Sequence, residues 1–165
     1  MRSLRLIVPM LALALVAAGC GESDDYESTT LSLESPAVES DLLENAPQGP
    51  SRGDTVVFAA PLSEEGGGEV GRFEGTGTVT DIDEGGAEPV ELRSSLVQFT
   101  LEEGTLVVAG VYSTPLGGRV PADEGVTRPV LGGTGEYEGA RGEVTQTPTS
   151  NGGQRHVFEI ETPSD

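Results

Sequence analysis

Residues 54–162 consist of short extended segments separated by glycine-rich, acidic clusters at regular spacing. The segments are rich in Val, Thr, Phe and Tyr, and none of them carries a sustained helical period. Residues that accept a positive φ occupy the clusters Glu64–Gly68, Glu84–Gly86, Glu102–Gly104 and Asn151–Gly153. The expected strands are Asp54–Ala60, Val70–Ile82, Val90–Leu101, Thr105–Tyr112, Val126–Leu131, Tyr137–Thr147 and Arg155–Thr162. Because no βαβ spacing is visible, the chain is predicted to be all-β.

The faces of these strands indicate how the sheet is covered. In Val70–Ile82, Phe73 and Val79 share one face with glycines, and the other face is polar. In Leu106–Tyr112 both faces are apolar, so a second sheet, a partner subunit or a loop must cover the outer one. Closure into a barrel would remove the free edges that an open sheet must protect. We therefore expect a seven- or eight-stranded antiparallel barrel, with an outer face that could serve a homo-oligomer.

The first 20 residues have the features of an export signal. Two arginines precede an apolar run from Leu6 to Ala18, and small residues lead up to Cys20. This arrangement is typical of a secretory signal peptide, and the run is too short to span a membrane comfortably. Cys20 is the only cysteine and stands where a lipobox has its lipidated residue, with Ala17 in the place where Leu is most frequent. We expect residues 1–19 to be removed and Cys20 to be lipidated, which would anchor the exported chain to the cell membrane, outside the cytoplasm.

Residues 20–52 are predicted to form an acidic tether. From Gly21 to Ser51 there is no basic residue, and the acids are spread among Ser, Pro and Thr. Residues 29–34 alternate between polar and apolar, which suits an edge strand, and the sequence leaves open whether they form the first strand of the barrel. The barrel domain is expected over residues 53–162, followed by a tail of residues 163–165.

The charge of the chain excludes some partners. Its formal net charge is −19, and it contains no lysine. Such an acidic surface repels phosphate backbones, so no nucleic-acid partner is expected. The same charge opposes docking on anionic lipid headgroups, which leaves the lipid as the expected membrane contact.

A glycine-rich stretch, Val130–Val144, carries a resemblance to known proteins. Its Gly132–Gly135 turn, followed by an aromatic residue and Ala140–Gly142, resembles the signature of plant dirigent proteins. Tyr137–Gly139 resembles the corresponding stretch of the allene oxide cyclases, and Phe58–Glu64 resembles the dirigent pattern upstream. The chain is thus similar to the allene oxide cyclase and dirigent families over most of the expected barrel.

That resemblance implies a fold and a range of activities. Both families form eight-stranded antiparallel, calycin-type barrels with a partly apolar cavity. Plant members cyclise an unstable epoxide or direct radical coupling, with no cofactor in the barrel. For this chain the resemblance implies a barrel that holds a small hydrophobic molecule.

Two residues are candidates for a catalytic role within the resemblance. Arg141 stands at the arginine of the family's Ala-Arg-Gly, and Glu136 stands where some dirigents carry an acid. Such a pair could stabilise charge in a cation-like intermediate. However, Ala59 and Ala60 stand where dirigents have acids, and a salt bridge on the barrel surface is the alternative role for Arg141.

Phe73, Tyr112, Tyr137 and His156 are the candidates for the wall of the cavity. His156 is the only histidine and Cys20 is assigned to the lipid, so a zinc site would lack its usual ligands. We therefore expect neither a metal nor a cofactor.

The sequence favours one function and leaves two others open. The favoured function is that of a membrane-anchored, exported barrel that binds a small hydrophobic molecule. The first alternative is a cofactor-free isomerase or cyclase that acts in the same cavity. The second is a cell-surface module that binds other proteins and needs no cavity.

Replacing Cys20 with Ser tests the anchor. The variant should lose lipid attachment and stay folded, because the residues after Cys20 are predicted to be tether. The mass of the mature protein and its partition into detergent measure the change. A wild-type protein that is secreted without an acyl group would contradict the lipobox.

Overall fold

The computed structural model describes residues 25–46, 49–122 and 124–164, which form one sheet of nine strands. The strands are β1 (Tyr26–Ser35), β2 (Glu39–Leu43), β3 (Thr55–Glu64), β4 (Glu69–Asp83), β5 (Val90–Leu101), β6 (Gly104–Pro115), β7 (Val126–Gly135), β8 (Arg141–Pro148) and β9 (Gln154–Pro163). Within these ranges no helix has the length and hydropathy needed to cross a membrane. The predicted signal peptide, residues 1–19, and Cys20 lie outside the described residues.

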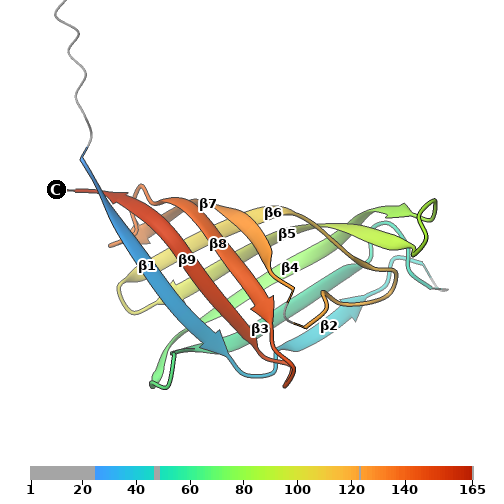
Figure 1. Cartoon of the computed structure of the whole chain (residues 1–165), viewed down its shortest axis with the longest axis horizontal. Helices are drawn as coiled ribbons and strands as arrows, with labels where there is room; N and C mark the ends of the chain where they lie inside the picture. Colours follow the sequence, from blue (N-terminus) through green and yellow to red (C-terminus); the bar gives the residue numbers. More distant parts are fainter. Residues whose placement is uncertain (1–24, 47–48, 123, 165) are drawn as a thin grey trace, which may run out of the picture.

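The sheet closes on itself through β1 (Figure 1). β1 pairs with β9 along its whole length, and its residues Leu33 and Glu34 also pair with Glu64 and Ser63 of β3. This second contact closes β1 and β3–β9 into an eight-stranded antiparallel barrel, and β2 pairs with Thr55–Ala59 of β3 as an extra strand. The prediction of an all-β barrel of seven or eight strands is confirmed.

The N-terminal part of the barrel begins earlier in the chain than the sequence predicted. Residues 20–52 were expected to be a tether with one candidate strand, whereas β1 and β2 both lie within them. β1 extends the candidate 29–34 at both ends, and Leu33 is buried in the core. β2 is exposed at every residue, Leu42 and Leu43 included, and is held by its backbone pairing with β3. Its five residues show no alternation of polar and apolar side chains that would predict a strand. At the other end of the chain, Pro163 is paired with Tyr26 and is not part of a tail.

The inside of the barrel is apolar toward one end. Strict alternation along β5 turns Val97 and Phe99 inward, and Phe99 stacks on Phe73 and meets Phe158 edge to face, at centroid distances of 5.6 and 4.9 Å. This half lies toward the β3–β4, β5–β6 and β7–β8 turns, which share one end of the barrel in Figure 1. Its other fully buried members are Leu62, Leu106, Val108 and Val144.

The turn between β7 and β8 depends on Gly135. Gly135 has a φ of 66°, and a Cβ there would lie 2.2 Å from the carbonyl oxygen of Glu103. This turn therefore requires at position 135 a residue that accepts a positive φ and has no Cβ. The strand expected from Tyr137 begins instead at Arg141, because residues 136–140 form the turn with hydrogen bonds such as Ala140 N–H to the Tyr137 carbonyl.

Gly135→Val should lower the free energy of unfolding by more than about 1 kcal/mol, because a β-branched residue is strained at this φ and would clash with the backbone. Chemical denaturation measures the change. Gly68→Val is the matched control, because Gly68 has no positive φ and an added Cβ meets nothing within 4 Å. Equal stability of the two variants would contradict the constrained turn.

Candidate functional site

A cavity of about 660 Å³ occupies the end of the barrel opposite to the apolar half. It is lined by inward side chains of β3 and β5–β8 and by the loops that join β2 to β3, β6 to β7 and β8 to β9. Val38, Ser40 and Leu42, in and before β2, and Gln154 of β9 complete its wall. Its volume lies in the range of small-molecule sites, about 300–1,000 Å³. β1 begins at the other end of the barrel, where Tyr26 pairs with Pro163 (Figure 1). The cavity therefore opens at the end far from the start of the described chain.

A second hollow, of about 870 Å³, lies on the outer surface across β2–β5. All of its lining residues are exposed or half-buried, Phe58 and Leu96 among them. None of its lining residues is a buried polar residue that could bind a ligand. The interior cavity is therefore the better candidate for a functional site.

The alternation of β5 brings charged and polar groups to the cavity. Glu91, Arg93 and Ser95 are buried on the same inward face as the core residues Val97 and Phe99, two residues apart along the strand. One strand thus passes from an ion pair at the cavity to phenylalanine in the core. The polar and apolar halves of the interior share a single continuous wall.

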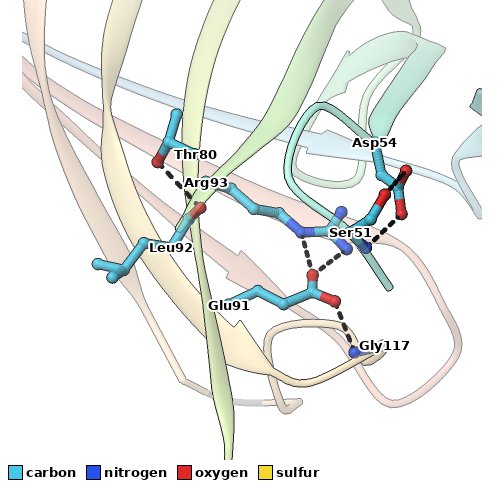
Figure 2. Close-up of polar contacts among 7 residues, drawn as sticks. All are labelled: Ser51, Asp54, Thr80, Glu91, Leu92, Arg93 and Gly117. Atoms are coloured by element: carbon cyan, nitrogen blue, oxygen red, sulfur yellow. Dashed lines mark hydrogen bonds and ion pairs between the residues drawn. The ribbon is translucent and has the colours of Figure 1, made fainter. Parts of the chain in front are cut away.

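Glu91 and Arg93 form an ion pair that also holds a loop (Figure 2). Arg93 donates from Nε and Nη2 to Oε2 of Glu91, at 2.9 and 2.5 Å. The other carboxylate oxygen, Oε1, accepts the backbone N–H of Gly117 at 2.7 Å. Glu91 is 1% exposed and Arg93 is 9% exposed. The pair is therefore buried, and it ties β5 to the loop between β6 and β7.

Arg128 of β7 is the second buried cation of the cavity. Its Nη1 donates to Oγ of Ser95 at 2.8 Å, and its guanidinium carbon lies 5.0 Å from the centre of the Tyr112 ring. Gly110 makes room for its stem, because a Cβ there would lie 2.9 Å from Cγ of Arg128. Burial lowers the pKa of Arg128 from its ordinary value. No carboxylate of the described residues forms a salt bridge with it.

Three buried polar atoms in the described part of the chain have no hydrogen-bond partner: Nε of Arg128, Oγ1 of Thr114 and Oε1 of Gln146. All three residues line the cavity. A buried polar group without a partner costs about 1–3 kcal/mol, so native structures contain few of them. Their concentration at one cavity indicates a place where another molecule supplies the partners.

His156 lies beneath the cavity, in contact with one of these residues. Its Nδ1 lies 3.0 Å from Nε2 of Gln146, and its Nε2 lies 3.5 Å from Oγ of Ser35. The ring meets Phe73 and Phe99 edge to face. Burial, and secondly the charge of Arg128, lower the pKa of His156 to about 3. The ring is therefore neutral at ordinary pH, and Gln146 separates it from the cavity.

The four predicted cavity residues have different positions. Tyr112 lines the cavity, and His156 supports Gln146 from below. Phe73 is fully buried in the apolar core. Tyr137 covers the opposite end of the barrel, where its hydroxyl donates to Glu103 at 3.3 Å. Burial and the nearby carboxylate of Glu103 raise the pKa of Tyr137 to about 12.

Glu136 and Arg141 are not brought to the cavity. Both are exposed, at the end of the barrel where β7 turns into β8. Arg141 donates to Glu161 on β9 at 2.9 Å, and its guanidinium carbon lies 3.6 Å from the centre of the Tyr26 ring. This position matches the surface salt bridge that was the alternative role of Arg141. The geometry gives the proposed catalytic pair no shared site.

The charged residues of the cavity were not predicted from the sequence. The alternation of side chains along the strands would have indicated them. Glu91 and Arg93 lie on the same face of β5 as the apolar residues Val97 and Phe99, and Arg128 lies on the same face of β7 as Val130. Gln146 likewise lies on the same face of β8 as the buried Val144, but its role depends on its contact with His156 on β9, which this alternation does not show. In the described part of the chain, no group of three or more His, Cys, Asp or Glu side chains is arranged to hold a metal ion.

The lowered pKa of His156 predicts a loss of stability in acid. Below pH 6.5 the unfolded chain binds a proton at His156, whereas the folded chain does not until about pH 3. Stability that is present at neutral pH is therefore lost as the pH falls, by roughly 2 kcal/mol between about pH 7 and pH 5. Denaturant unfolding at both pH values measures it. His156→Gln should remove this loss, and an equal loss in variant and wild type would contradict the buried neutral histidine.

Comparison with known proteins identifies the family of this fold. The model of the allene oxide cyclase barrel-like domain matches residues 35–158. A pyocyanin demethylase structure aligns with a TM-score of 0.65 and 22% identity, over 80% of this chain and 99% of that chain. The Diels-Alderase AbmU from Streptomyces koyangensis aligns with a TM-score of 0.61 and 20% identity, over 87% of this chain and 71% of that one. The pterocarpan synthase dirigent protein PsPTS1 aligns with a TM-score of 0.51 and 16% identity, over 84% and 94%. No curated protein sequence matches the chain. The chain belongs to the allene oxide cyclase barrel-like family.

Proposed function

We propose that the barrel binds a small, largely apolar organic molecule in its interior cavity, in a protein that is exported and anchored to the membrane through Cys20. The observation that supports binding most directly is the set of unpartnered atoms on Arg128, Thr114 and Gln146, which all belong to this one cavity. A ligand with a few polar groups would satisfy them. The rest of its surface would lie against apolar and aromatic wall residues such as Val56 and Phe58.

The anchoring rests on the sequence. A basic head, an apolar run and small residues precede Cys20, as in lipoprotein precursors. Two or more acyl chains at such a cysteine hold a protein stably at a membrane. Cys20 lies only five residues before the first described residue, Asp25, so little chain would separate the lipid from the barrel.

A second candidate function is a cofactor-free isomerisation or cyclisation in the same cavity. The similar barrels include proteins described as Diels-Alderases. In this chain a buried guanidinium with an unpartnered donor, that of Arg128, could stabilise negative charge that develops on a substrate oxygen. The cavity would then bind the transition state of the reaction more tightly than the substrate.

Binding in the cavity can be tested with N-phenylnaphthylamine, an uncharged dye that fluoresces in apolar sites. The wild-type protein should bind it, and Val126→Trp should weaken binding by roughly tenfold or more, because Val126 lines the cavity and the indole would take up space that the dye needs. Thr127→Trp is the matched control, because Thr127 is exposed on the outer face of the same strand. Equal affinities of the two tryptophan variants, or no binding by the wild type, would contradict the proposal. Native mass spectrometry of protein from its own source would then identify a retained ligand.

A further inference from the structure

We infer that the cavity selects an organic anion, whose acid group is held by Arg128 while its apolar body fills the rest of the space. This inference rests on the proposed binding function and specifies its ligand class. The two buried carboxylates and two buried guanidinium groups of the cavity balance in number, but both carboxylates interact with Arg93. The inference follows from Arg128, which is left without an acid partner and with one edge of its guanidinium without an acceptor.

Both buried carboxylates of the cavity already have hydrogen-bond partners within the protein. Glu91 is shared between Arg93 and the backbone N–H of Gly117. Asp54 accepts the backbone N–H groups of Asn45 and Ser51 at 2.7 and 2.8 Å, and the Ser51 hydroxyl at 2.7 Å. These hydrogen bonds, led by the one from Asn45, lower the pKa of Asp54 and keep it ionised. Neither carboxylate forms a salt bridge with Arg128, and no other acid among the described residues does.

A buried cation without a counter-ion lowers the stability of the folded protein, and this chain has many acidic residues that could supply a counter-ion. Desolvation of an ion costs several kcal/mol unless a partner offsets it. The chain contains 28 acidic residues against nine basic ones, yet the Arg128 guanidinium donates to the Ser95 hydroxyl and lies over the Tyr112 ring. Neither side chain is a carboxylate. A binding site that supplies the counter-charge only when its ligand is present accounts for this arrangement.

The geometry of Arg128 suits a planar acid group. Its bond to Ser95 uses Nη1 and fixes the orientation of the guanidinium. Nε, on the other edge, has no acceptor among the described residues. The edge formed by Nε and Nη2 presents two parallel N–H groups, which is the fork that binds a carboxylate through both oxygens. Oε1 of Gln146, also without a partner, would accept a hydroxyl or N–H of the same ligand.

Two dyes that differ by one acid group test the inference. Anilinonaphthalene sulfonate carries the ring system of N-phenylnaphthylamine and adds a sulfonate. At about 0.15 M salt, where charges more than about 8 Å apart are screened, the wild type should bind the sulfonate dye at least roughly tenfold more tightly than the uncharged dye. Equal affinity of the wild type for the two dyes would overturn the inference, whatever the variants do.

Arg128→Gln and Arg128→Met should abolish this preference by weakening the sulfonate dye alone. Both variants remove a buried charge that has no counter-ion, so we expect them to fold, which thermal unfolding checks. Arg155→Gln is the matched control, because it removes the same charge from an exposed position outside the cavity. A preference that survives in folded Arg128 variants would also overturn the inference.

The same measurements separate this inference from the proposed function. If neither dye binds, or if Val126→Trp leaves both affinities unchanged, binding in the cavity itself is wrong. If the uncharged dye binds in a manner that Val126→Trp blocks, but the sulfonate confers no advantage, the cavity binds ligands without selecting anions.

Discussion

Two buried guanidinium groups inside one small barrel impose the energetic cost that the rest of the structure has to offset. For Arg93, the desolvation is offset by its ion pair with Glu91, whose other oxygen accepts a backbone N–H from the β6–β7 loop. Arg128 has no such ion pair among the described residues, so its desolvation must be balanced by packing elsewhere. The packed rings of Phe73, Phe99 and Phe158 fill the opposite half of the interior. The division of the interior into an apolar half and a charged half is thus an energetic requirement as well as a geometric one.

A neutral hydrogen-bonded chain joins these halves. Gln146 faces the cavity and also contacts His156, which lies among the phenylalanines and reaches Ser35 on β1. If Gln146 donates to Nδ1, then Nε2 carries the ring proton and points toward Ser35. This leaves the amide oxygen of Gln146 directed to the cavity, where it lacks a partner. The histidine therefore contributes to the site by orienting an amide, while itself remaining uncharged.

The fold could be predicted from the sequence, whereas most of the site could not. Regular glycine-rich turns and alternating strands set the all-β class, and the Gly132–Gly135 motif indicated the family. Of the four candidates for the cavity wall, Tyr112 is the one that lines the cavity. Glu136 and Arg141 were chosen for their position in that motif. The motif builds a turn at the closed end of the barrel, which is the apolar end opposite to the cavity. Which residues meet inside depends on pairings between distant strands, such as Ser95 with Arg128, and sequence spacing does not contain them.

The direction in which β1 enters the barrel has a consequence for a lipid-anchored protein. The described chain starts at the closed end, beside Pro163, and the cavity opens at the opposite end. A lipid at Cys20 would hold the closed end next to the bilayer and turn the opening toward the surrounding water. Such a protein would exchange its ligand with the aqueous phase and not with the lipid leaflet. Its anchor would fix where the barrel samples dissolved molecules, without bringing the membrane's own lipids to the cavity.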